Sequence, residues 1–180
     1  MIGYAITGSF CTHARALVTL KALIECGYDV LPVVSETVYA TDTRFGRAEL
    51  LLAQMEEICG RRVLHTIVET EPLGPKTPLE LLVIAPCTGN TLAKMAHGIT
   101  DTAVTMAAKA QLRGDRPLLI GLCSNDALSA NMANLALMRQ KKHVSFVPMA
   151  MDDPEKKPHS LVCDFGAIPQ AVRGILGNGT

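Results

Sequence analysis

The order of apolar and amphipathic segments constrains the fold of this chain more than any other feature. Runs without polar alternation are typical of parallel strands buried on both faces, and apolar residues three or four positions apart indicate helices. Strand-like runs cover residues 2–7, 30–34, 79–85, 118–122 and 144–147, and helix-like segments lie near residues 17–26, 47–59, 90–97, 101–113, 128–135 and 167–176. The alternation predicts an α/β fold, a three-layer sandwich in which one doubly wound, Rossmann-like parallel sheet carries helices on both faces.

Polar segments interrupt this pattern in three places. Residues 71–78 contain three prolines, too many for a helix or a central strand. We assign no helix or strand to residues 35–46 or to the proline-containing residues 152–158. Because no repeat or shift in composition divides the 180 residues, we expect a single domain over residues 1–180.

The composition of the chain argues against several classes of function. The chain has 17 Lys and Arg and 17 Asp and Glu, and this balance argues against binding to nucleic acid or to an anionic membrane. With four Phe, three Tyr and no Trp, a stacking platform for single strands is also disfavoured. No run approaches the roughly 20 apolar residues that cross a bilayer. The six cysteines form no CxxC pair, so we expect a reduced, cytoplasmic protein.

Small polar residues follow three of the predicted strands, at positions 7–9, 86–91 and 124–126. The carboxyl ends of parallel strands meet at one edge of a sheet, where α/β proteins bind their ligands. The N-termini of the helices that follow suit a phosphate or a carboxylate. Such residues also cap helices, but three clusters on one edge favour a ligand site.

The known nucleotide motifs are missing. The first strand–helix turn contains one glycine, Gly8, where a dinucleotide site requires GxGxxG, and no GxxxxGK[ST] is present. This chain alone is therefore a poor candidate for binding NAD or hydrolysing ATP. Cys11, Cys87 and Cys123 lie near strand ends, where each fits a nucleophile or, more commonly, a small apolar filler. No HExxH or CxxC pattern supports a metal site.

Two predicted loops carry conspicuous cations. Arg44 and Lys76 interrupt the apolar pattern without belonging to a helix face. In an ordered loop, such side chains bind carboxylates or phosphates, although they can equally be solvated. Lys109, Lys156 and Lys157 fit better as surface residues.

Residues 85–92, Ala-Pro-Cys-Thr-Gly-Asn-Thr-Leu, resemble the Pro-Ala-Ser-Ala-Asn-Thr signature of the FMN-binding flavoprotein superfamily. This group includes the flavin-containing cysteine decarboxylases, phosphopantothenoylcysteine decarboxylase and the flavin prenyltransferases. Residues 6–9 resemble its first FMN-phosphate turn, and residues 116–125 resemble its segment ending in Pro-Ala-Met-Asn. The resemblance implies an FMN-binding domain with a Rossmann-like fold.

Further blocks resemble one subfamily, the flavoprotein subunits of bacterial dipicolinate synthases. The blocks are residues 7–9, 11–12, 42–46, 71–76, 85–91, 124–128, 152–154 and 156–158. This resemblance implies a part in oxidising a dihydro- or hydroxytetrahydrodipicolinate precursor, a small cyclic dicarboxylate, to dipicolinate during sporulation. It also implies a dipicolinate synthase A subunit that supplies NAD(P), a homo-oligomer (a trimer or a multiple of trimers), and the mother-cell cytoplasm.

The resemblance, taken residue by residue, also implies the site. FMN phosphate would contact Gly8, Ser9 and Ser35, and Asn125, Arg44 and Lys76 are candidates for binding substrate. The positions implied to contact the cofactor are Thr7, Gly8, Ser9, Ser35, Pro86, Thr88, Gly89, Asn90, Thr91, Ala107, Ala108, Ser124 and Asn125.

Departures from the superfamily pattern keep other functions open. Pro72 occupies the position of the decarboxylases' catalytic histidine, and Leu122 and Ser124 replace the Pro and Met of Pro-Ala-Met-Asn. Both departures disfavour decarboxylation of a peptidyl cysteine. A flavin-dependent decarboxylase, a flavin prenyltransferase and a non-catalytic, flavin-carrying accessory subunit are the alternatives.

Overall fold

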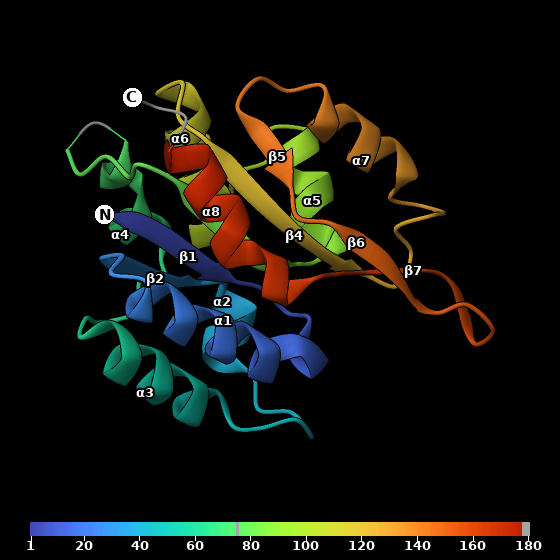
Figure 1. Cartoon of the computed structure of the whole chain (residues 1–180), viewed down its shortest axis with the longest axis horizontal. Coiled ribbons are helices and arrows are strands. Elements are labelled where there is room, and N and C mark those ends of the chain that lie inside the picture. The colour runs from blue at the N-terminus through green and yellow to red at the C-terminus, as the bar shows by residue number, and fades with distance from the viewer. Residues whose placement is uncertain (75, 178–180) are drawn as a thin grey trace.

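A seven-stranded sheet forms the centre of the molecule in the computed structural model, which describes residues 1–74 and 76–177 (Figure 1). The strands are β1 (Ile2–Ile6), β2 (Val30–Val34), β3 (Leu82–Cys87), β4 (Leu118–Ser124), β5 (Val144–Phe146), β6 (Met149–Asp153) and β7 (Lys157–Cys163). The helices are α1 (His13–Glu25), α2 (Glu36–Ala40), α3 (Ala48–Cys59), α4 (Ile67–Thr70), α5 (Gly89–Ala96), α6 (Ala103–Arg113), α7 (Met132–Arg139) and α8 (Ile168–Gly177), with short 3₁₀ turns η1 (Phe10–Thr12), η2 (Glu71–Leu73) and η3 (Phe165–Ala167).

The strand order β2-β1-β3-β4, with parallel pairing throughout, confirms the doubly wound fold. Every residue of β1, β3 and β4 is buried, as their continuous apolar runs predict. Helices α1, α3 and α8 contribute apolar residues to the core on one face, and α5, α6 and α7 contribute to the core on the other. The sheet is therefore the middle of three layers. None of the helices within the described residues is long and apolar enough to span a membrane.

Strand β4 changes partner along its length. Its first half pairs with β5 in parallel, whereas its last two residues pair with β7 in antiparallel orientation, Cys123 opposite Val162 and Ser124 opposite Leu161. Strands β6 and β7 form an antiparallel hairpin that extends beyond the helices (Figure 1). The assignment of residues 152–158 as lacking a strand is therefore wrong. Most of β6 is exposed, so its sequence carries no pattern of burial that indicates a strand.

Most other boundaries agree with the sequence to within two residues, but α7 begins four residues later than predicted, at Met132, and α1 begins four residues earlier, at His13. Helix α3 ends at Cys59, and the next residue, Gly60, has a φ of 63°, a left-handed backbone conformation that glycine adopts without strain. Two short helices were not expected: α2 within the polar residues 35–46, and α4 just before the proline-rich segment. Strand β3 begins at Leu82, three residues later than predicted.

Candidate functional site

The three polar clusters after β1, β3 and β4 meet in one cavity of about 820 Å³. Gly8 and Ser9 contribute from the β1 end, residues 88–90 from the β3 end, and residues 124–126 from the β4 end. This volume lies within the range of small-molecule sites in proteins. The expectation that parallel strand ends bring these clusters together is confirmed.

Thr7 fixes the first two clusters to each other. Its hydroxyl donates to the carbonyl of Pro86 (2.8 Å) and accepts from the N–H of Thr88 (2.9 Å). Both Thr7 and Pro86 are buried behind the cavity wall, and the Ala85–Pro86 peptide bond is cis. The loops after β1 and β3 are therefore held by hydrogen bonds between them, independently of any ligand.

Thr88 caps the helix that points its N-terminus toward the cavity. Its hydroxyl oxygen accepts from the N–H of Thr91 (3.2 Å) and donates to the Thr91 hydroxyl (3.0 Å). Helix α5 begins at the next residue, so Gly89 and Asn90 occupy the first turn, where N–H groups lack partners within a helix. Thr88 therefore caps the helix, and the N–H groups of the first turn remain as hydrogen-bond donors at the edge of the cavity.

Asp126 anchors the third cluster. It accepts hydrogen bonds from the Ser124 hydroxyl and from Asn131 Nδ2 (2.9 Å). The bond from Ser124, more than any other interaction, lowers the pKa of Asp126, so the carboxylate is charged at neutral pH. Position 89 packs against this group: a Cβ there would lie 2.8 Å from Asp126 Oδ1 and would collide with Ser124 and Asn131. Glycine at this position allows α5 to approach the loop.

Three cations line the same cavity: Arg15 from α1, Arg44 from the loop after α2, and Lys157 from β7. Lys157 forms an ion pair with Asp152 (2.6 Å), which raises the pKa of its ammonium group. Arg44 lies over the ring of Phe45, 4.8 Å from the ring centre. Lys157 is exposed, as predicted for a surface residue. It also lines the cavity, which the sequence did not indicate.

Lys76 lies elsewhere, which corrects the idea of a two-cation clamp. It precedes β3, in a segment where the N–H of Glu80 donates to the carbonyl of Met1 (3.0 Å). That segment is at the amino ends of the strands, whereas Arg44 is at the carboxyl ends. Within one copy of the chain the two cations cannot hold one small ligand. Pro75, the neighbour of Lys76 in that loop, is outside the described residues.

Besides Thr7 and Pro86, four implied positions do not line this cavity: Ser35, Thr91, Ala107 and Ala108. Thr91 is buried in the first turn of α5. Ser35 is buried beside the end of β1: its N–H donates to the carbonyl of Ile6 (3.1 Å), and its hydroxyl caps α2. Ala107 and Ala108 of α6 are buried in the core. Sequence reasoning missed Arg15, whose only signal is its place in the first turn of the helix after β1.

The cysteines separate into different environments. Cys11 is exposed at the cavity, Cys87 is fully buried in the core on the α5–α6 face, and burial raises the pKa of the Cys87 thiol well above its usual range. This environment favours an apolar filler at Cys87. Cys123 reaches the cavity wall. Within residues 1–74 and 76–177, no group of three His, Cys, Asp or Glu residues is arranged to hold a metal ion.

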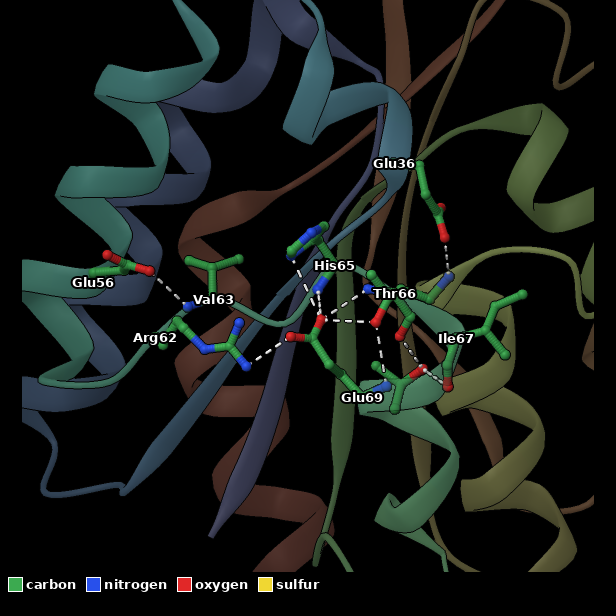
Figure 2. A network of polar contacts seen from close by, with 10 residues as sticks. Glu36, Glu56, Arg62, Val63, His65, Thr66, Ile67 and Glu69 are labelled. Atoms are coloured by element: carbon green, nitrogen blue, oxygen red, sulfur yellow. Dashed lines mark hydrogen bonds and ion pairs between the residues drawn. The ribbon is translucent and has the colours of Figure 1, made fainter.

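A second polar network surrounds the start of α4, outside the cavity (Figure 2). Thr66 and Glu69 form a capping box: Glu69 N–H donates to Thr66 Oγ1 (3.3 Å), and Thr66 N–H donates to Glu69 Oε2 (3.0 Å). The carboxylate also receives the His65 N–H (3.0 Å) and pairs with Arg62 (2.6 Å). Burial alone would raise the pKa of Glu69, but hydrogen bonds from His65, Thr66 and Arg62 lower it to about 2.

His65 belongs to this second network. Its ring stacks on Tyr39 with a centroid distance of 3.6 Å and an interplanar angle of 3°, and its Nδ1 lies 3.5 Å from Glu69 Oε2. These partners give His65 a structural role that its sequence position did not indicate.

Comparisons with known proteins identify the family of the chain and support its fold. The family model described as Flavoprotein matches residues 1–173. The dipicolinate synthase B subunit of Bacillus subtilis (strain 168) is 42% identical over 175 residues, covering 97% of this chain and 88% of that protein.

Solved structures extend this similarity. The crystal structure of the dipicolinate synthase B subunit from Bacillus halodurans C has a TM-score of 0.89 and 39% identity, covering 98% of this chain and 90% of that one. A dodecameric, FMN-dependent UbiX-like decarboxylase from Escherichia coli O157:H7 has a TM-score of 0.69 at 17% identity, covering 98% and 94% of the two chains. The second likeness concerns the fold alone.

Proposed function

This chain belongs to the flavoprotein family and is a homologue of the dipicolinate synthase B subunit, and on that basis we propose that it is the FMN-binding component of a two-subunit dipicolinate synthase. It would act in the mother-cell cytoplasm of a sporulating bacterium. NAD(P) would be bound by a separate A subunit, in keeping with the missing dinucleotide motif here. The observation that carries the proposal is the convergence of three strand-end clusters and two arginines on one cavity.

The residues around the cavity fit FMN. The N–H of Gly8 has no acceptor among the described residues, and the first turn of α5 adds further donors. Gly8 and Ser9 would hold the phosphate, and Arg15 would balance its charge. The flavin ring would lie along residues 88–91, with Ser124 and Asn125 at the third strand end. When bound, FMN supplies two-electron chemistry, and the protein supplies orientation and electrostatics.

The second arginine of the cavity suits a dicarboxylate substrate. Arg44 lies on a cavity that opens to solvent, and its guanidinium is suited to bidentate binding of a carboxylate. Asp126 is charged in the same cavity and would repel a dicarboxylate, which favours substrate binding on the Arg44 side. The proposed reaction is oxidation of a dihydro- or hydroxytetrahydrodipicolinate precursor to dipicolinate.

The assembly is also part of the proposal. The FMN-dependent relative from Escherichia coli is dodecameric, and another relative of the same fold, from Burkholderia xenovorans, is described as a cubic protein cage for redox transfer. We propose a homo-oligomer for this chain, a trimer or a multiple of trimers. Lys76 and the alanines of α6 would then be tested as contributors from a neighbouring copy.

Two measurements test the proposed function. First, the purified chain is titrated with FMN and followed by flavin fluorescence, and we expect saturable binding of one FMN per chain. Second, the A subunit, this chain and both together are assayed with dihydrodipicolinate and a nicotinamide cofactor. Dipicolinate formation that requires both chains and FMN supports the proposal. Full activity of the A subunit alone would mean that this chain is a non-catalytic accessory. Absence of FMN binding would contradict the proposed cofactor.

A further inference from the structure

Two buried cysteines from different strands lie side by side next to the cavity. The Sγ atoms of Cys123 in β4 and Cys163 in β7 are 3.7 Å apart, and both residues carry free thiols. Gly121 makes room for this contact, because a Cβ at position 121 would lie 2.9 Å from Cys163 Sγ and 2.8 Å from the Ala85 Cβ. A disulfide needs the sulfurs to approach to about 2.05 Å, a small movement for side chains that are already in contact.

The pair connects the cavity with the outer surface. Cys123 lines the cavity in which we propose that FMN binds. Cys163 lines two separate hollows of about 440 and 490 Å³, one along α1 and the η3 turn and the other along β6. Arg15 lines all three spaces, so it lies between them. Cys123 therefore borders the proposed cofactor site, and Cys163 borders two hollows outside it.

The surroundings of the pair shift the pKa values of its two thiols in opposite directions. A hydrogen bond from Cys163 lowers the pKa of Cys123, and Thr12 and Arg15 act in the same direction. The same hydrogen bond raises the pKa of Cys163, and burial adds to that effect. A thiol with a lowered pKa in contact with a second thiol is the arrangement from which dithiols are oxidised. The buried Cys87 differs, because the partner of its Sγ is the backbone carbonyl of Thr88 (3.6 Å) and not a second thiol.

We propose that Cys123 and Cys163 form a redox-active dithiol that exchanges two electrons with FMN bound in the cavity. This inference rests on the proposed FMN binding. In the oxidising direction the two S–H bonds break, one S–S bond forms, and two protons and two electrons leave the sulfurs. Oxidised FMN accepts both electrons with protons from the pair, and the reverse reaction restores the two thiols. The dithiol would store a second electron pair beside the flavin.

An anaerobic reductive titration tests the inference on the FMN-loaded protein. The protein is first oxidised with diamide, freed of reagent and then titrated with dithionite, while the flavin absorbance is recorded. A flavin alone takes up two electrons per chain, and a flavin coupled to a disulfide takes up four. We expect four electrons for the wild type, and a non-reduced digest that contains a peptide with Cys123 linked to Cys163.

Matched cysteine variants show which residues take up the additional two electrons. Cys163→Ala and Cys123→Ala should each lower the uptake to two electrons, and Cys87→Ala, a buried cysteine on the opposite face of the sheet, should keep four. Uptake of two electrons by wild-type protein with bound FMN, whether or not the disulfide has formed, overturns the inference and leaves the proposed function intact. Failure to load FMN at all would instead overturn the proposed function. The wild-type result decides the question even if a cysteine variant fails to fold.

Discussion

The cavity and the network around α4 contain the same kinds of polar residue, but they differ in which of their hydrogen-bonding groups have partners. Thr66 and Thr88 each cap a helix through a side-chain oxygen. At α4, the carboxylate of Glu69 accepts a hydrogen bond from the N–H of the capping Thr66 and binds Arg62, so the polar groups satisfy one another (Figure 2). At α5, no carboxylate closes the turn, and the helix N-terminus is left facing a cavity. A structural cap and a candidate binding site therefore differ in whether the N–H groups of the helix N-terminus remain available to a ligand.

The largest expected effect comes from filling the space between α5 and the loop after β4. Gly89→Ala places a methyl group 2.8 Å from Asp126 Oδ1 and against Ser124 and Asn131. Overpacking of this kind costs about 1–3 kcal/mol of unfolding free energy. We expect FMN affinity to fall by more than about tenfold because the cavity wall must move.

Gly174→Ala is the matched control for this substitution. Its Cβ would meet nothing within 4 Å, and Gly174 lies inside α8. The control should leave FMN affinity unchanged and raise stability slightly, by about 0.5–1 kcal/mol. Chemical denaturation and flavin titration measure both quantities. Equal flavin affinity in the two variants would contradict the role given to Gly89.

The second prediction concerns the two loop cations. Arg44→Ala should weaken the binding of dipicolinate to the FMN-loaded protein by about tenfold, or about 1.4 kcal/mol, because a charged hydrogen bond is lost. Lys76→Ala should not change that affinity within one copy, since the residue lies at the other edge of the sheet. Calorimetric titration with dipicolinate measures both. A comparable loss for Lys76→Ala would mean that a neighbouring copy completes the cavity.

The third prediction compares the two caps directly. Thr66→Ala and Thr88→Ala should each lower the free energy of unfolding by about 1 kcal/mol. Only Thr88→Ala should also weaken FMN binding, because only that cap borders the cavity. Urea denaturation with parallel flavin titration separates the two effects. If both variants lose flavin equally, the distinction between the regions fails.

The last prediction concerns pH. The folded-state pKa of Glu69 is lowered to about 2 from its ordinary value of 4.5. A lowered pKa stabilises the fold above the unfolded value, and that contribution disappears as pH falls through the folded value. The stability difference between wild type and Glu69→Gln should therefore be full above about pH 5 and shrink steadily toward pH 2. Urea unfolding at several pH values measures it, and a difference that does not vary with pH would contradict the assignment.

Much of the fold could be predicted because burial of β1, β3 and β4 leaves a continuous apolar pattern in the sequence. The strand-end clusters were predictable for the same reason, since parallel strands place their carboxyl ends together. The pattern Thr66-x-x-Glu69 also signals a helix start, and it could have revealed α4.

Other parts of the site depend on contacts between distant segments. Arg15 and Lys157 reach the cavity from α1 and from the hairpin, and nothing local in their sequence distinguishes them from surface cations. Lys76 shows the opposite case, because a cation that looked equivalent to Arg44 lies at the far edge of the sheet. The exposed residues of β6 likewise carry no periodic signal, although backbone pairing with β7 makes them a strand.

The change of partner along β4 has a consequence for how this protein can diverge. The β6–β7 hairpin joins the sheet at only two positions of β4, and those positions border the cavity. Insertions, deletions or replacements near the tip of the hairpin would therefore alter what reaches the cavity without disturbing the packing of the parallel strands. The hairpin is a module on which new specificity can evolve, while the sheet beneath it keeps a constant frame.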